Sequence, residues 1–400
     1  MKTFNKFFQG DRVIWVVVAL LALTSLLAVY SATGTYANSE HDGNNVYVLL
    51  RHAATLALGL AAMYVAHLVK YTYYSRIFQF AFWISIPLLL YTLLLGADIH
   101  DAKRVIHFFG VSFQSSDFAK IALIGYLSRM ITIKQDEIKD FKNAFVPLML
   151  PVLVIVGLIF PENLSTAAIL FVSSMVLLFV GRINMKYLFL FFGIGLFALT
   201  LYVLIALNVA ENHGRALTWV NRVERFVDSF GGSDGDDEET MVITDEEFQS
   251  IHSRIAIAGG GLIGKSPGRS TQRNVLPYPY SDFIFAIVIE EYGLLGGVFV
   301  MMLYLILLYR AIVIMVAIPQ SFGGFISFGL AFMIVMQAMI NIGVAVGILP
   351  VTGQPLPFVS MGGTSLMFTG IAIGVILSVS KEINKINDKK NELIPTESDN

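Results

Sequence analysis

The chain has 400 residues, of which 56% are hydrophobic and 14% are charged, and its formal net charge at pH 7 is −2. Soluble domains carry about 25% charged residues, so this composition indicates a polytopic membrane protein and gives no sign of a nucleic-acid partner. The absence of cysteine excludes a disulfide framework, a cysteine metal site and a cysteine nucleophile.

Ten apolar runs follow one another along the chain, and we expect each of them to form a transmembrane helix. The first run is too long for the apolar core of a signal peptide, so we interpret it as a retained helix. Two runs fit less well, because 144–160 contains Pro147 and Pro151 and 116–133 contains three charged side chains. The expected spans are 13–31, 46–68, 77–96, 116–133, 144–160, 164–181, 186–208, 283–309, 325–347 and 363–380.

Lysine and arginine residues indicate the orientation, because they are enriched in short cytoplasmic loops. With the N-terminus in the cytoplasm, most basic residues outside the segment 209–280 fall on the cytoplasmic side. We therefore predict an all-α polytopic membrane protein with ten transmembrane helices, both termini cytoplasmic, and one long extracytoplasmic loop, 209–280, between helices 7 and 8. Residues 1–380 would form a single transmembrane domain, and the polar segment 381–400 a disordered cytoplasmic tail.

The first candidate functional residue is Asp282, which follows Leu276-Pro277-Tyr278-Pro279-Tyr280-Ser281 and opens the eighth apolar run. A carboxylate at the edge of a span is costly, roughly 2.5–3.5 kcal/mol at mid-bilayer on insertion scales, and such residues are functional candidates. The alternative is that Asp282 only caps the following helix, because Asp is favoured at the N-cap. The predicted topology places it on the same outer side as the Pro- and Gly-rich segment 349–365.

Three further charged residues lie near the predicted outer side. Arg51 lies early in the second span, where a long side chain could extend its charge to the surface. Asp117 and Lys120 are three residues apart at the start of the fourth span, so they share a helix face. This pair could be purely structural, or it could present Lys120 to an anionic ligand.

Residues Gly259–Ser266 match the G-x-x-x-x-G-K-S pattern of a P-loop letter for letter. A P-loop needs a helix that begins at the Lys-Ser pair, so that its N–H groups face the phosphates. Pro267 follows immediately and disfavours helical geometry at Ser266. We therefore reject nucleotide binding and expect the glycines to let a loop pack closely as it returns to the membrane.

Two motifs stand out in the second half of the chain. The first is Leu276-Pro277 followed by Ser281-Asp282-Phe283-Ile284-Phe285-Ala286, Glu290-Glu291 and Gly293, and the second runs from Gly347 to Phe358 and ends in Gly362-Gly363-Thr364-Ser365. Together they resemble the signatures of the SEDS family of shape, elongation, division and sporulation proteins (FtsW, RodA and SpoVE). Gly10-Asp11-Arg12 and the segments 30–34 and 270–273 favour the division-associated FtsW branch. Two departures are His52 for a glutamine after Arg51, and Val105 for a tryptophan after Lys103-Arg104.

The resemblance implies a peptidoglycan glycosyltransferase of the bacterial inner membrane that acts at the division septum. Its substrate would be lipid II, a disaccharide-pentapeptide on undecaprenyl pyrophosphate. Its partners would be a class B penicillin-binding protein, which crosslinks the product, and other divisome proteins. Asp282 occupies the position of the essential catalytic residue of the family.

This chemistry needs one general base and cations that stabilise a pyrophosphate leaving group. We predict Asp282 as the base, with Arg51, Lys103, Arg104 and Lys120 as pyrophosphate ligands. Asp117 and Ser365 complete the predicted substrate-binding set. A divalent cation such as Mg²⁺ or Mn²⁺ could assist, although the sequence shows no dedicated cage for one.

Two other classes of protein are compatible with the same sequence. A lipid II flippase would also have many helices and intramembrane charges, and a non-catalytic scaffold would only recruit the penicillin-binding protein. A transporter needs a polar path through both halves of the membrane, whereas the charges here cluster on the predicted outer side. We therefore favour the enzyme.

Overall fold

The computed structural model describes residues 9–33, 45–95, 97–99, 102–108, 111–209, 245–276, 279–318 and 321–392. The first half of the predicted loop 209–280, from 210 to 244, lies outside this part of the chain. The helices and strands are, in chain order, α2 (Arg12–Ala32), α4 (Asn45–Leu68), α5 (Tyr71–Leu95), β1 (Ala97–Ile99), β2 (Ala102–Phe108), β3 (Val111–Gln114), α6 (Ser115–Ile133), η1 (Gln135–Glu137), η2 (Phe141–Phe145), α7 (Val146–Ile159), α8 (Leu164–Val180), α9 (Met185–Val209), α11 (Asp245–Gly260), η3 (Gln272–Asn274), α12 (Ile284–Ala317), α13 (Phe322–Ala345) and α14 (Thr364–Glu392).

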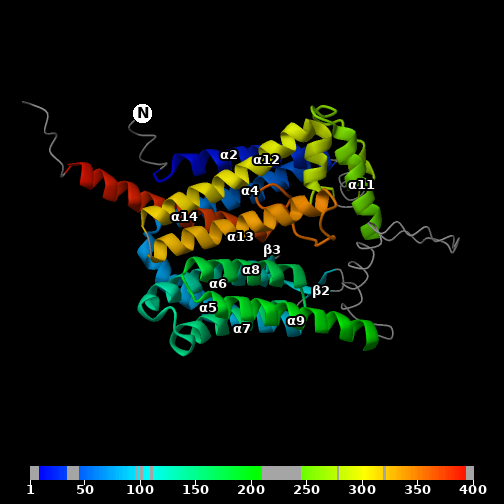
Figure 1. Cartoon of the computed structure of the whole chain (residues 1–400). Helices are drawn as coiled ribbons and strands as arrows, with labels where there is room; N and C mark the ends of the chain where they lie inside the picture. Colours follow the sequence, from blue (N-terminus) through cyan, green and yellow to red (C-terminus); the bar gives the residue numbers. More distant parts are fainter. Residues whose placement is uncertain are drawn as a thin grey trace, which may run out of the picture.

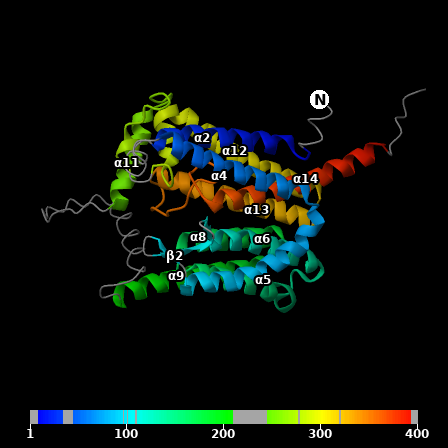
Figure 2. The same cartoon turned by 180° about the vertical axis from the view of Figure 1, so that it is seen from behind.

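The long helices run side by side, and α11 crosses one end of them (Figure 1, Figure 2). The start of α2 and the far end of α14 lie at the opposite end in both views. We call these two ends the α11 end and the terminal end. Helices α2, α4, α12, α13 and α14 lie together, α5 to α9 form a second group, and α13 connects the groups by packing against α6 and α8.

Glycines allow α4 and α14 to approach each other closely. A Cβ atom on Gly370 would lie 2.2 Å from the carbonyl oxygen of Gly59, and one on Gly374 would lie 2.3 Å from the carbonyl oxygen of Met63. Any larger residue at these two positions would separate the helices. Small residues at such contacts are typical of membrane proteins, in which van der Waals packing of close backbones drives helix association.

A small antiparallel sheet connects α5 to α6. Its strand order is β1-β2-β3, and Val105 of β2 lies opposite Gln114 of β3. The all-helical prediction did not include this sheet, although β2 and β3 contain Val, Ile and Phe residues that favour strands. Because β3 leads directly into α6, the sheet fixes where that helix begins.

The prediction of a helical, polytopic membrane protein is confirmed. Each of the ten expected spans coincides with a helix, and seven described helices are long and apolar enough to cross a membrane. The others are α6, which contains Asp117, Lys120 and Arg129, and two shorter apolar helices, Leu164–Val180 and Met185–Phe197. The count of ten spans and the outside position of the 209–280 loop stay predictions.

Two segments that we expected to be irregular contain helices. Helix α11 lies within the predicted loop 209–280, and α14 continues to Glu392, which lies within the segment 381–400 that we expected to form a disordered tail. Residues 381–392 include the helix formers Lys and Glu and contain no Gly or Pro, so α14 meets no stop signal there. Residues 393–400 lie outside the described part of the chain.

Three helices are tied together at the terminal end. The Asp11 carboxylate caps α2 by accepting a hydrogen bond from Val13 N at 2.9 Å, and it forms an ion pair with Arg310 of α12 at 2.6 Å. The backbone N–H of Asp11 donates to Ser380 Oγ of α14 at 2.9 Å. Residues at the start of α2 and in α14 therefore meet at one end of the bundle, which agrees with the prediction that both termini lie on the same side of the membrane.

Candidate active site

The connection between α13 and α14 is folded into the protein near the α11 end (Figure 1). Leu356, Phe358 and Val359 are buried in it, and Leu356 N donates to Ser360 Oγ at 2.8 Å. Irregular backbone inside a membrane protein is tolerated where protein buries it or where it lines a cavity. This loop does both, because Pro357 lines a cavity.

Asp282 lies just before α12, where the chain enters the bundle. The helix begins at Ile284, and its N-cap is Phe283, which makes no side-chain capping bond. Asp282 lies one residue before this N-cap. Capping and catalysis stay compatible interpretations, because an Asp can contact the start of a helix and also act as a base. The half-buried carboxylate accepts a hydrogen bond from Ser281 Oγ at 2.9 Å, and its Oδ2 lies 3.8 Å from the place that a Cβ of Gly353 would occupy.

The backbone around Asp282 is held by α13 and by the loop that follows it. Asn341 Nδ2 donates to the carbonyl oxygen of Asp282 at 2.7 Å and to that of Gln354 at 2.8 Å. Ser360 Oγ donates to the carbonyl oxygen of Ser281 at 2.5 Å. Asn341 thus joins the two sequence motifs, and the carboxylate of Asp282 is presented from a backbone fixed on both sides.

Asp117 and Lys120 form a buried ion pair in the first two turns of α6. Lys120 Nζ lies 2.8 Å from Asp117 Oδ1, and each residue is only 6% exposed. Lys120 also donates to Gln337 Oε1 of α13 at 3.4 Å. Asp117 Oδ2 is buried without a hydrogen-bond partner among the described residues.

A cavity brings together three of the predicted site residues, Asp117, Lys120 and Ser365. Gln337 adds a polar side chain, whereas Phe368 and the neighbouring aliphatic side chains make the rest of the lining apolar. Ligand sites typically combine an apolar wall with a few convergent polar groups. The lining has this composition, and the cavity volume of about 20 Å³ is enough for roughly one water molecule.

Two amides of α13 connect this cavity to Asp282. Gln337 Nε2 donates to the carbonyl oxygen of Pro355 at 3.0 Å, one residue along the loop from the carbonyl that Asn341 binds. Gln337 and Asn341 are four residues apart and therefore share a helix face. Neither residue is among the site residues predicted from the sequence, although two amides on one face of an apolar helix are a signal for polar contacts inside a membrane protein.

Among the remaining predicted cations, Arg51 is the one whose side chain the structure describes, and it lies away from this cavity. Arg51 is exposed on α4, and it does not line the cavity. Lys103 and Arg104 lie on β2, but their side chains are outside the described residues. Their roles as substrate ligands stay predictions. Within the described ranges, no three His, Asp or Glu side chains converge as ligands for a metal ion.

The segment that matches a P-loop contacts α12 and not a phosphate site. Ser266 has a positive φ of 84°, and no helix begins at Lys265 or Ser266. Lys265 Nζ forms an ion pair with Glu290 Oε1 at 2.7 Å. A Cβ on Gly264 would lie 2.2 Å from the carbonyl oxygen of Glu291, so the expectation that the glycines permit close packing is confirmed.

The chain matches the model of one protein family over most of its length. The family model described as "Cell cycle protein" (FtsW/RodA/SpoVE) matches residues 11–385. The chain belongs to this family. Among the members of the FtsW/RodA/SpoVE family, stage V sporulation protein E of Bacillus subtilis is 33% identical over 378 residues, which are 92% of this chain and 96% of that protein. The probable peptidoglycan glycosyltransferase FtsW of Geobacter metallireducens is 32% identical over 384 residues, covering 92% of this chain and 94% of that protein.

Solved structures share the fold over almost the whole chain. One is a chain from a study of the structural coordination of polymerization and crosslinking by a peptidoglycan synthase complex, with a TM-score of 0.72, 22% identity, and coverage of 94% of this chain and 98% of that one. The crystal structure of the rod shape determining protein RodA of Thermus thermophilus gives a TM-score of 0.65 at 23% identity and covers 93% of this chain and 97% of that one. The FtsW/RodA/SpoVE resemblance predicted from the two motifs is confirmed.

Proposed function

We propose that this protein is a peptidoglycan glycosyltransferase that polymerises lipid II into glycan strands during cell division. Membership of the family supports this proposal, as do relatives named probable peptidoglycan glycosyltransferase FtsW. The observation that carries the proposal is the burial of the Asp282 side chain and the way its backbone is held. Its carboxylate is half-buried just before α12, and Asn341 joins its backbone to the second motif.

Polymerisation joins a hydroxyl of one lipid II molecule to the anomeric carbon of another and expels undecaprenyl pyrophosphate. The α-linked donor becomes a β-1,4 glycan, so the configuration inverts and one general base suffices. Asp282 takes the proton of the acceptor hydroxyl as the new C–O bond forms. The bond between the anomeric carbon and the pyrophosphate breaks at the same carbon, and the leaving group keeps the electron pair.

The leaving pyrophosphate needs electrostatic stabilisation more than it needs a proton. Lys120 supplies a cation in a cavity with an apolar wall, where charge interactions are stronger than in water. Asp117 orients that ammonium, and Ser365 donates a hydroxyl hydrogen bond on the same side. Arg51, Lys103 and Arg104 are proposed as further cations for substrate phosphates.

The proposal includes a class B penicillin-binding protein as partner, together with other divisome proteins. A likeness in fold to a chain of a peptidoglycan synthase complex supports such a partnership. The same proposal places the protein in the bacterial inner membrane, at the division septum. Several relatives of the chain are named FtsW, which supports this location.

The test is polymerisation of lipid II by the purified protein in vesicles, with and without its partner penicillin-binding protein. We expect wild-type protein to form glycan strands and Asp282→Asn to lower the rate by about 10²–10⁴-fold, the usual contribution of a general base. Polymer formation by Asp282→Asn at the wild-type rate would remove Asp282 from this role. Movement of labelled lipid II across the vesicle membrane without any polymer would instead support the flippase.

A further inference from the structure

The helix that follows Asp282 is broken near the α11 end. Gly293, inside α12, has φ 72° and ψ −178°, which are not helical angles. The break separates an outer segment, residues 284–292, from the long remainder of the helix. At 1.5 Å per residue this segment is roughly 13 Å long, so a small tilt of it displaces Asp282 at its start.

The loop after α11 supplies hydrogen bonds that α12 loses at the break. The backbone N–H groups of Lys265 and Ser266 donate to the carbonyl oxygens of Glu290 and Glu291 at 2.9 and 3.1 Å. A Cβ on Gly293 would lie 2.2 Å from a carbonyl oxygen of the same loop. The loop therefore replaces the missing turn of the helix and fits only a glycine at the break.

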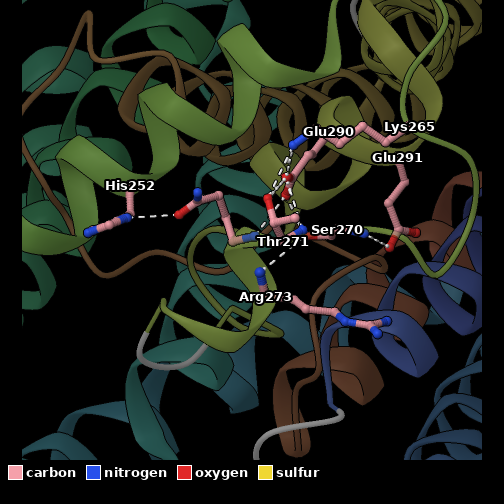
Figure 3. A network of polar contacts seen from close by, with 8 residues as sticks. His252, Lys265, Ser270, Thr271, Arg273, Glu290 and Glu291 are labelled. Atoms are coloured by element: carbon pink, nitrogen blue, oxygen red, sulfur yellow. Dashed lines mark hydrogen bonds and ion pairs between the residues drawn. The ribbon is translucent and has the colours of Figure 1, made fainter.

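Two side chains reinforce this contact. Glu290 is fully buried, and Figure 3 shows it pointing from α12 toward the loop. Its carboxylate accepts hydrogen bonds from Lys265 Nζ at 2.7 Å, Thr271 N at 3.0 Å, Thr271 Oγ1 at 2.8 Å, Gln272 N at 3.3 Å and the Ser270 hydroxyl. Because Glu290 has no exposed surface and the loop saturates its oxygens, it cannot act by touching a substrate.

The neighbouring Glu291 ties the same segment to α2. Its Oε1 accepts hydrogen bonds from the Ser31 hydroxyl and from Ser270 N, the latter at 3.3 Å. Arg273 Nη1 donates to Ser31 Oγ at 3.2 Å and so ties the loop to α2 as well. The outer segment of α12 is thereby fixed against the loop that precedes it and against α2, which is 260 positions away in sequence.

We infer that Glu290 and Glu291 are positioning residues for Asp282. They fix the far end of the outer segment of α12, while Asn341 and Ser360 fix the backbone at its near end. The carboxylate of Asp282 is thus held in one position relative to the cavity that Asp117, Lys120 and Ser365 line. The inference rests on the proposed function of Asp282, and it adds residues that lie two turns of helix away from the reacting atoms.

The first test compares Glu290→Gln, Lys265→Met and their combination in the lipid II polymerisation assay. Glutamine keeps the shape of Glu290 but turns an NH₂ group toward the donors of the loop. A misplacement of about 1 Å in an active site can cost roughly 10²-fold, so we expect kcat per folded protein to fall by about 10- to 10²-fold. KM should change little, and the double variant should be no slower than Glu290→Gln.

The matched control is Asp11→Asn, which breaks a buried carboxylate–cation pair at the other end of the same helix. We expect it to reduce stability while kcat per folded protein stays at the wild-type value. If Glu290→Gln behaved like Asp11→Asn, its role would be structural only and the inference would be overturned. If Asp282→Asn were inactive while Glu290→Gln behaved like Asp11→Asn, only the positioning role would fail. If Asp282→Asn also stayed active, the role proposed for Asp282 would fail as well.

A second readout does not depend on activity. The chain has no cysteine, so Asp282→Cys introduces a single thiol whose rate of modification by a water-soluble maleimide reports the surroundings of position 282. We expect Glu290→Gln to change this rate several-fold and Asp11→Asn to leave it unchanged. An equal rate with and without Glu290→Gln would show that Glu290 does not set the place of residue 282, whatever the enzyme assay gives.

Discussion

Replacing Lys120 by methionine separates the two roles that the Asp117–Lys120 pair can have. The pair is buried, and its Nζ–Oδ1 distance is 2.8 Å. Methionine keeps much of the side-chain length but removes the charge, so Asp117 becomes a buried carboxylate without a counter-charge. Removing one partner of a buried pair costs about 3–5 kcal/mol, and we expect Lys120→Met to lower the unfolding free energy by that amount.

The double variant Asp117→Asn/Lys120→Met removes both charges at once. Neutral replacements of a buried ion pair are often tolerated, and the asparagine leaves at most one poorly satisfied polar group, which costs about 1–3 kcal/mol. We therefore expect most of the stability lost in Lys120→Met to return. Stability is measured by thermal unfolding in detergent, with the exposed Lys186→Met as the control for loss of a lysine.

The activity of the double variant then shows whether Lys120 binds the substrate or only stabilises the fold. If Lys120 stabilises the leaving pyrophosphate, the double variant is folded but polymerises lipid II about 10²–10³-fold more slowly, the usual effect of removing one such electrostatic group. Polymerisation at the wild-type rate would refute the ligand role and leave the pair as a structural element. A Lys120→Met variant as stable as wild type would refute the reasoning from burial.

Two further substitutions test the geometry around Asp282. Gly293→Ala places a Cβ at a positive φ and 2.2 Å from the carbonyl oxygen of Leu262, so we expect little folded protein by size-exclusion chromatography; normal yield and melting would contradict the fit described for the break. Asn341→Ala leaves the carbonyls of Asp282 and Gln354 without their amide donor, which should cost about 1–3 kcal/mol and lower polymerisation per folded protein, whereas the exposed Asn143→Ala should change neither.

The parts of this protein that could be predicted from sequence have local causes. Apolar runs long enough to span a membrane locate the helices. Asp117 and Lys120 share a face because they are three residues apart in a helix. Asp282 stands out because a carboxylate at the edge of a span is costly.

The parts that could not be predicted depend on contacts between distant residues. Asn341 binds the carbonyl of Asp282 across 59 positions of sequence, and Gln354 binds Thr166 across 188. The loop that holds Gln354 has no periodicity from which its shape could be read. Gly293 alone does not predict the break in α12, because an isolated glycine within a helical pattern is tolerated. The hydrogen bonds that stabilise the break come from another segment of the chain.

The loop that bridges the break in α12 precedes that helix in the chain, so the ribosome has already made residues 261–266 when α12 enters the membrane. Unpaired backbone groups cost several kcal/mol each in hydrocarbon, and this loop can pair them as soon as the helix is inserted. Helix α13 is in the opposite situation, because Gln337 and Asn341 donate to carbonyls of residues 354 and 355, which are made later. The backbone groups at the break in α12 can therefore be paired during synthesis, whereas Gln337 and Asn341 of α13 reach these two acceptors only after the following loop has folded back.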